Sequence, residues 1–310
     1  MRLRVLMEPR HGGTYEDFLA MATVVEDAGF EGFFRSDHLM GVDPTNTAYQ
    51  PTDSWTMLAG LARDTRRVRL GALVTAGTFR QPGVLATTVA MVDQMSGGRV
   101  DFGIGAGWFA EEHTAFGLEF PAVAARFERL EEQLKIITGL WETPRGTPFT
   151  FTGKHYRLRN NGILPRTAQS PRPPIIVGGA GARKTPTIAA RHADEFNLSF
   201  PQGLKARNEN FNRICAELGR DPATVRRSVV LPVACGETPA EANRRAETIA
   251  APPLRAEAVV GTPRAVADRV AALQADGVDT VYFFHLFDIK DLDHIRLIGA
   301  EVVPLLSALP

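Results

Sequence analysis

The tripeptide Ser36-Asp37-His38 places a carboxylate beside an imidazole, immediately after a short apolar run at 32–35. His38 titrates near neutral pH and is the best candidate for a general acid or base, while Asp37 could hold its tautomer or raise its basicity. The structural alternative is that Asp37 turns the chain and His38 packs into a loop. Because the catalytic groups of α/β barrels stand at the carboxyl ends of strands, this position favours catalysis.

The run GIGAGW at 103–108 follows another predicted strand and has glycines at alternate positions. With no side chains at these positions, a flat ring could approach the backbone at Gly105 and Ala106. The same pattern could equally be a strand end without a ligand. It is not a P-loop, because GK[ST] is absent, and it is not a Rossmann fingerprint, because no glycine-rich turn leads directly into a helix.

A second glycine-rich segment lies at 178–181, between a predicted strand and a predicted helix at 183–192. Backbone N–H groups at a helix N-terminus attract anions, so this segment could bind a phosphate, and a purely structural turn is the alternative. The candidate phosphate ligands are Gly178, Gly179 and Ala180, with Arg183 or Lys184 in support.

Short β-branched or aromatic runs alternate along the chain with longer amphipathic segments, which is typical of parallel strands joined by helices. We expect strands at 4–7, 32–35, 68–74, 99–103, 174–177, 195–199, 228–234 and 280–285. Eight such units predict a closed (β/α)8 barrel of the α/β class, and we expect one domain over 1–310. An open doubly wound sheet usually has fewer strands and a GxGxxG turn after the first.

Two regions interrupt this alternation. The larger is an insertion at about 142–173, between the fourth helix and the fifth strand, where alternating aromatic residues at 149–158 predict a hairpin. The smaller is a Gly/Pro/Asn-rich loop at 40–52. Loops of this length are often lids, although plain insertions are about as common.

Composition excludes several classes of function. The 35 basic and 35 acidic residues cancel, so nothing attracts nucleic acid over a distance. No apolar stretch approaches the length of a membrane span or signal peptide, and Cys215 and Cys235 do not suggest a disulfide framework. We expect a cytoplasmic protein without a metal site, because the seven histidines are dispersed and HExxH is absent.

Several aromatic side chains could form the walls of an apolar substrate pocket, although each is individually more typical of ordinary packing. The candidates are Trp55, Trp108 and Phe284, with Phe79 as a further one. His285 is a candidate second polar group, and a structural role for it is at least as common.

The strand-end residues resemble those of luciferase-like oxidoreductases, particularly the branch that depends on coenzyme F420. The resemblance is carried by SDHL at 36–39, LGALVTAGTFRQP at 70–82, LATTVAMVDQMSGGRVDFGIGAGW at 85–108, RFERLEEQLKIITGLW at 126–141 and PPIIVGGAGARKTPTIAARHADEFN at 173–197. It implies a (β/α)8 barrel, commonly a homodimer, with the cofactor ring across the carboxyl-terminal mouth.

The resemblance also implies roles for individual residues. A backbone bulge near Leu73 and Val74, often with a cis peptide, would support the face of the ring, and Asp37 and His38 would contact the ring region. The cofactor would be lined by Thr75, Ala76, Gly105 and Ala106, and its phosphate would be held by Gly178 and Gly179.

The motif at 36–38 favours the deazaflavin F420 over FMN, with hydride transfer to or from a small organic substrate and His38 exchanging the proton. The acidic residue that the family's sugar-phosphate dehydrogenases carry after the fourth strand aligns with Trp108, which argues against a sugar phosphate. Glu111 or Glu112 could supply a carboxylate instead. The alternatives are an FMN-dependent monooxygenase that uses O2 and a non-catalytic ligand-binding barrel.

Overall fold

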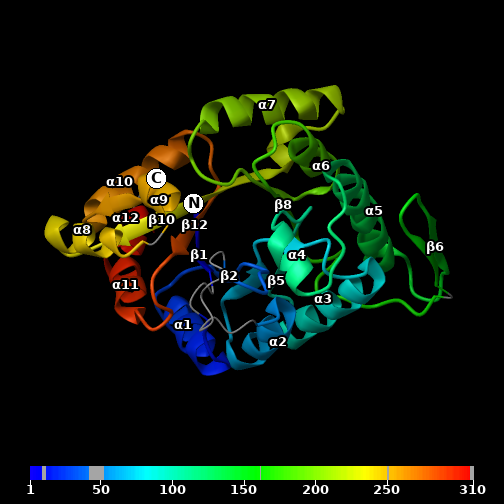
Figure 1. The fold of residues 1–310 in the computed structure, drawn as a ribbon, viewed down its shortest axis with the longest axis horizontal. Coiled ribbons are helices and arrows are strands. Elements are labelled where there is room, and N and C mark those ends of the chain that lie inside the picture. Colours follow the sequence, from blue (N-terminus) through cyan, green and yellow to red (C-terminus); the bar gives the residue numbers. More distant parts are fainter. Residues whose placement is uncertain (9–11, 42–51, 161, 250, 308–310) are drawn as a thin grey trace.

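Eight parallel strands close into a barrel in the computed structural model, which describes residues 1–310 except 9–11, 42–51, 161, 250 and 308–310 (Figure 1). The barrel strands are β1 (Arg2–Met7), β2 (Gly32–Arg35), β3 (Arg69–Ala72), β5 (Val100–Gly105), β8 (Ile175–Gly178), β9 (Glu195–Asn197), β10 (Arg226–Cys235) and β12 (Thr280–His285). Strand β12 pairs with both β1 and β10, and β10 pairs with β9, so the eight barrel strands form a closed ring. The predicted fold class is confirmed.

Helices cover the outside of the barrel (Figure 1). They include α1 (Tyr15–Asp27), α2 (Ser54–Asp64), α3 (Pro82–Ser96), α5 (Val123–Glu142), α6 (Lys184–His192), α7 (Leu204–Glu217), α8 (Pro239–Glu247), α10 (Pro263–Ala275), α11 (Leu292–Leu297) and α12 (Val303–Ser307). Local signals set their ends: Asp53 accepts a hydrogen bond from Thr56 N at 2.8 Å before α2, and Gly97 ends α3 with φ of 70°. Among the described residues, no helix is both long and apolar enough to cross a bilayer.

Side chains alternate along each strand between two apolar layers, as strand geometry requires. Val5, Phe33 and Phe102 belong to the layer beneath the helices, whereas Leu6 and Phe34 belong to a separate cluster with Ile176 and Tyr282. The second cluster fills the inside of the barrel, so the barrel is packed and is not a pore.

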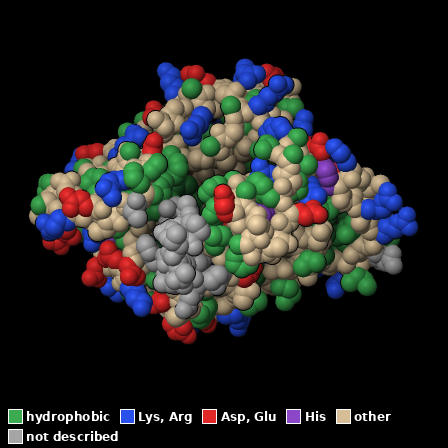
Figure 2. Space-filling model, viewed as in Figure 1, with side chains coloured by type: hydrophobic (Ala, Val, Ile, Leu, Met, Phe, Trp, Pro, Cys, Tyr) green, Lys and Arg blue, Asp and Glu red, His purple; other side chains and the backbone are tan. Residues whose placement is uncertain are grey.

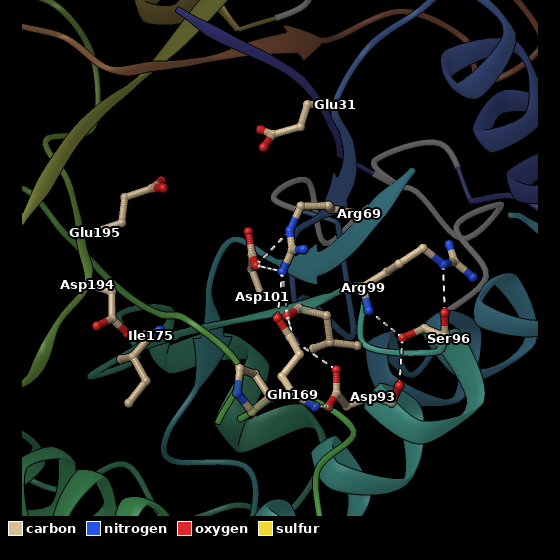
Figure 3. A network of polar contacts seen from close by, with 12 residues as sticks. Glu31, Arg69, Asp93, Ser96, Arg99, Asp101, Gln169, Ile175, Asp194 and Glu195 are labelled. Carbon is tan, nitrogen blue, oxygen red and sulfur yellow. Dashed lines mark hydrogen bonds and ion pairs between the residues drawn. The ribbon is translucent and has the colours of Figure 1, made fainter. Parts of the chain in front are cut away.

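A buried ionic cluster crosses the barrel near the start of the strands. Arg4 is fully buried; its Nη2 lies 2.8 Å from Asp101 Oδ2, and its Nη1 donates to the Tyr282 hydroxyl at 2.7 Å. Tyr282 in turn donates to Glu195 at 2.8 Å. Figure 3 shows Arg69 reaching Asp101 from β3, with an Nε–Oδ1 distance of 3.0 Å. Each buried charge has a partner, which is the condition under which ions are tolerated away from water.

The segment between α5 and β8 contains an antiparallel hairpin, β6 (Phe149–Thr152) and β7 (Arg157–Asn160). Beyond the hairpin, the Gln169 amide donates to Asp93 Oδ1 at 2.8 Å and to Val100 O at 2.7 Å (Figure 3). This segment is therefore fastened to α3 and β5, at the end of the barrel where the strands begin.

Two strand predictions were wrong in detail. The single strand expected at 68–74 is divided into β3 and the short β4 (Thr75–Ala76), because the chain bulges at Leu73 and Val74, whose peptide bond is cis. Strand β11 (Val259–Gly261) extends the sheet beside β10 and was not expected, since three residues carry too little periodicity to be recognised.

Candidate active site

A cavity of about 960 Å³ opens at the carboxyl ends of the barrel strands. Figure 2 shows a hollow near the middle of this face, partly bordered by hydrophobic side chains. The predicted site residues that line the cavity are Asp37, His38, Leu73, Val74, Thr75, Ala76, Gly105, Ala106, Trp108, Gly178, Gly179, Ala180 and Phe284. The volume is in the range of ligand sites, and the residues come from strand ends that are distant in the sequence.

His38 is held by Glu112, which belongs to the short helix α4 (Ala110–Ala115). The His38 Nδ1 atom lies 3.1 Å from Glu112 Oε2, and the other carboxylate oxygen accepts from the backbone N–H of Leu39 and, at 3.0 Å, from that of Met40. Glu112 is 1% exposed, so these bonds form away from bulk water. The carboxylate thus fixes both the imidazole ring and the backbone that follows it.

The environment of His38 favours its protonated form. Burial alone would lower the pKa of the imidazole, but the hydrogen bond with Glu112 and the negative charges of Glu8, Glu112 and Asp37 outweigh burial and raise the pKa above its usual value. A raised pKa increases the share of His38 that carries a proton. This is the protonation state that a general acid requires.

Asp37 makes different contacts from those expected. Its Oδ2 accepts from Ala76 N at 3.0 Å and from Arg80 Nη1 at 2.7 Å, and its Oδ1 accepts from the Ser54 hydroxyl at 2.5 Å. The expected role of Asp37 in holding the tautomer of His38 belongs instead to Glu112, because the Asp37 oxygens are occupied by these donors. Asp37 ties the end of β2 to β4 and to the start of α2.

Glu8 also lines the cavity, and the sequence reasoning missed it. It follows β1 directly, and its Oε1 accepts from the Ser36 hydroxyl at 2.9 Å. The same strand-end rule that selected His38 would have found Glu8. It adds a second carboxylate whose charge acts on the imidazole.

The glycines of β5 and β8 make room for the bulge at 73–74. A Cβ at Gly103 would lie 2.1 Å from Ala72 O, and one at Gly105 would lie 2.8 Å from Val74 Cγ2. A Cβ at Gly178 would lie 3.1 Å from Val74 Cγ1. The expected reason for Gly105, close approach of a ring, is therefore incomplete, because a side chain at Gly103 or Gly105 would clash with the bulged segment even without a ligand.

The turn before α6 has the features of an anion cradle. Gly179 has φ of 146°, which side chains rarely adopt, and a Cβ there would lie 3.3 Å from Thr185 Oγ1. A Cβ at Gly181 would lie 3.0 Å from the same hydroxyl. Backbone and hydroxyl thus line a concave surface at a helix N-terminus facing the cavity, where N–H groups attract anions.

Aromatic rings form part of the cavity wall. Trp108 is 62% exposed, stacks on Phe109 with 5.1 Å between centroids, and meets the His38 ring edge-on at 5.6 Å. The expectation for Trp55 was wrong: it does not line this cavity, because its ring is buried against Phe102 and its indole N–H donates to Thr75.

His285 also lies outside the cavity, in a buried pair with His294. The His294 Nε2 atom accepts from Cys235 N at 3.1 Å, so its Nδ1 carries hydrogen toward His285 Nδ1 at 3.5 Å, and His285 Nε2 donates to Asp288 O at 3.1 Å. This chain of bonds requires both rings to be neutral. Burial, the main cause, lowers the pKa of both imidazoles. Among the described residues, no His, Cys, Asp and Glu cluster could hold a metal ion.

A closed parallel barrel with a cavity at the carboxyl ends of its strands is the architecture of (β/α)8-barrel enzymes. The luciferase-like monooxygenase family model matches residues 1–255, and the chain belongs to this family.

Curated relatives include enzymes of two cofactor types. The FMNH2-dependent dimethylsulfone monooxygenase of Pseudomonas putida is 26% identical over 93% of this chain and 87% of its own length. The F420-dependent glucose-6-phosphate dehydrogenase of Microbacterium testaceum is 34% identical over 58% of this chain, and the match spans only 51% of that relative.

Solved structures share the fold at low identity. An F420-dependent secondary alcohol dehydrogenase, in complex with an F420–acetone adduct, superposes with a TM-score of 0.83 at 19% identity, and the match covers 98% of both chains. DmoA from Hyphomicrobium sulfonivorans gives 0.81 at 17% identity, over 98% of this chain and 88% of its own. Membership of this family therefore supports an oxidoreductase activity, and the relatives of this chain include enzymes that depend on F420 and on FMN.

Proposed function

We propose that the chain is an F420-dependent oxidoreductase that transfers a hydride between the deazaflavin and a small organic substrate. The observation that carries this proposal is His38, held by the buried Glu112 at the wall of the cavity with a raised pKa. Hydride transfer to a carbonyl, or from an alcohol, needs one proton to be delivered or removed, and an imidazole in this environment can do so.

The other residues of the cavity would hold the cofactor and orient it toward the substrate. Gly178, Gly179 and Thr185 would take the cofactor phosphate at the start of α6, and the bulge at 73–74 would support the ring. Bound F420 would supply the hydride at a ring carbon. The apolar wall formed by residues such as Phe109 would exclude water from the reacting groups, so that positioning contributes much of the rate.

Similarity to several F420-dependent dehydrogenases supports F420; that of Kineococcus radiotolerans is 30% identical over 74% of this chain. The second candidate is an FMN-dependent monooxygenase, which the long match to the Pseudomonas putida enzyme favours. A substrate without phosphate is supported by the charge of the cavity. Arg126 is the one Lys or Arg side chain among the described residues that line it, whereas a phosphate dianion calls for several cations.

Equilibrium binding of purified protein to F420 and to FMN, under matched salt and pH, tests this proposal. Tenfold tighter binding of F420, followed by reduction of carbonyl or unsaturated substrates with reduced F420, would support it. The reverse preference, with oxygen consumption in the presence of reduced FMN, would support the monooxygenase. Binding of neither would favour the non-catalytic barrel.

We also propose that the protein is a homodimer that uses the outer face of α2 and α3. A groove of about 580 Å³ lies there, and none of the described side chains that line it is charged. Val84 is 65% exposed and Met91 is 50% exposed on this face. A second copy can pack against such a surface without like-charge repulsion. Met91→Glu should convert the dimer to a monomer in sedimentation; an unchanged coefficient would exclude this face.

A further inference from the structure

Trp108 is exposed although it stands in the main cavity. It is 62% exposed, and among the described residues that line the cavity it is the one exposed Trp, Tyr or Phe. Phe109 and Phe284, by comparison, are 7% and 6% exposed. A large apolar surface in contact with water is unfavourable, and in a concave site it is typical of a place that a ligand covers.

The backbone on both sides of Trp108 is held by hydrogen bonds. The Gly107 carbonyl accepts from Arg126 Nη1 at 3.0 Å, and the Phe109 carbonyl accepts from His113 Nδ1 at 2.6 Å. Both donor residues are buried, since His113 is 1% exposed and Arg126 is 9% exposed. The ring of Trp108 therefore stands on a fixed backbone, and its exposure is not that of a loose surface loop.

One face of the Trp108 indole is already covered. It stacks on the Phe109 ring with 16° between the planes and 5.1 Å between the centroids, so the exposed area lies on the opposite side and at the rim. The His38 ring is inclined at 81° to the indole, with 5.6 Å between the centroids. A flat group that lies on the open surface of the indole is therefore beside the imidazole. Aromatic rings favour such an offset, near-parallel arrangement.

We propose that Trp108 selects substrates with a flat aromatic or conjugated group, which stacks on its exposed surface next to His38. The proposal rests on the proposed function only in taking this cavity as the substrate site. The cofactor ring is the other flat group that could lie there, but the bulge at 73–74 is the support proposed for that ring, so we assign the indole to the substrate. A saturated group of equal size is puckered and covers less of the indole, so it should bind more weakly.

Two ketones of similar size test this selection, acetophenone and its saturated counterpart 1-cyclohexylethanone. Calorimetry would measure the affinity of both for the protein loaded with whichever of F420 and FMN binds, or for the protein alone if neither binds. The variants are Trp108→Leu, which removes the flat surface, and Trp108→Phe, which keeps a smaller one. Phe116→Leu is the matched control, because Phe116 is 43% exposed at the end of α4 but does not line the cavity.

Stacking predicts that the ratio of the two affinities, acetophenone over the saturated ketone, falls about two- to tenfold in Trp108→Leu. The ratio should be intermediate in Trp108→Phe and unchanged in Phe116→Leu. Trp108 is exposed, so these variants should fold; if Trp108→Leu does not, a lowered ratio in Trp108→Phe gives the same comparison.

A ratio that stays the same in every Trp108 variant would overturn the proposal. A loss of riboflavin affinity in Trp108→Leu that equals the loss of acetophenone affinity would also overturn it, because the indole would then stack on the cofactor ring. The ratio of affinities does not depend on hydride transfer. Failure of the proposed function would instead appear as absence of F420 binding, with the preference for the flat ketone still present.

Discussion

Replacing Glu112 separates its effect on the fold from its effect on catalysis. Each buried donor left without its acceptor costs about 1–3 kcal/mol. Glu112→Ala strands the His38 ring nitrogen and two backbone N–H groups, so we expect a loss of about 3–5 kcal/mol in the free energy of unfolding, because water from the cavity can reach some of these donors. Glu112→Gln keeps a carbonyl oxygen for the Leu39 and Met40 N–H groups and should lose only about 1–2 kcal/mol.

Catalysis should respond in Glu112→Gln even though the fold remains. A hydrogen bond between charged groups contributes about 1.5–3 kcal/mol, which corresponds to about a ten- to hundredfold loss of turnover. Without the carboxylate the pKa of His38 falls. In the direction that needs His38 as an acid, activity is present below that pKa and lost above it, so the descending limb of the pH–rate profile should move to lower pH.

Urea unfolding and single-turnover kinetics across pH would measure both effects. Glu111→Gln is the matched control, because Glu111 is the exposed neighbour on the same helix. Glu112→Gln that turns over at the wild-type rate with an unmoved pH limb would refute the assignment of Glu112 as the residue that positions His38. If Glu112→Ala had the same free energy of unfolding as the wild type, the buried N–H groups would not depend on Glu112 as their acceptor.

Three further outcomes follow. His38→Ala should bind cofactor normally but lose turnover about a hundredfold or more, and unchanged turnover would remove His38 from the mechanism. Gly179→Val should weaken cofactor affinity at least tenfold through its φ of 146° and loss of space, whereas wild-type affinity would move the phosphate elsewhere. His285 and His294 have lowered pKa values, so unfolding releases them to take up protons, and the stability they contribute is present above about pH 6.5 and lost as the pH falls below it. Urea unfolding at about pH 7.5 and about pH 5.5 should show a lower free energy of unfolding at the lower pH, and the difference should be smaller in His285→Phe. Equal differences in the wild type and the variant would exclude the histidine pair as the cause.

The barrel could be predicted because each strand carries its own signal. β-branched and aromatic runs such as 32–35 and 280–285 are buried on both faces, and caps such as Asp53 mark where helices begin. The bulge at 73–74 was expected only from the family resemblance, because the residue pattern at 74–77 does not predict a bulge. Strand β11 was not predicted, because it is defined by its pairing with β10, a contact that the local sequence pattern does not show.

The sequence predicted where the site residues lie, but it did not predict which residues hydrogen-bond to one another. The strand-end rule placed His38 at the cavity, yet it could not distinguish adjacent Asp37 from Glu112, which is 74 positions away and arrives through α4. Asp37 was chosen because it is adjacent in sequence, whereas the fold turns its oxygens toward Arg80 and Ser54. Arg126 was missed for a related reason: it lies in a helix, and the rule examines only strand ends.

Closure of the ionic cluster joins the two ends of the chain, since Arg4 and Tyr282 stand 278 positions apart. On the ribosome, Arg4 and Asp101 are made long before β12, and until that strand emerges β1 and β10 are open edges that could pair with other chains. Insertion of β12 seals both edges in a single step and sets the phenol of Tyr282 between Arg4 and Glu195. A nascent or truncated chain that stops before Thr280 would have two unpaired strand edges and would lack the Tyr282 member of the ionic cluster. We therefore expect the chain to be most prone to aggregation until β12 has paired.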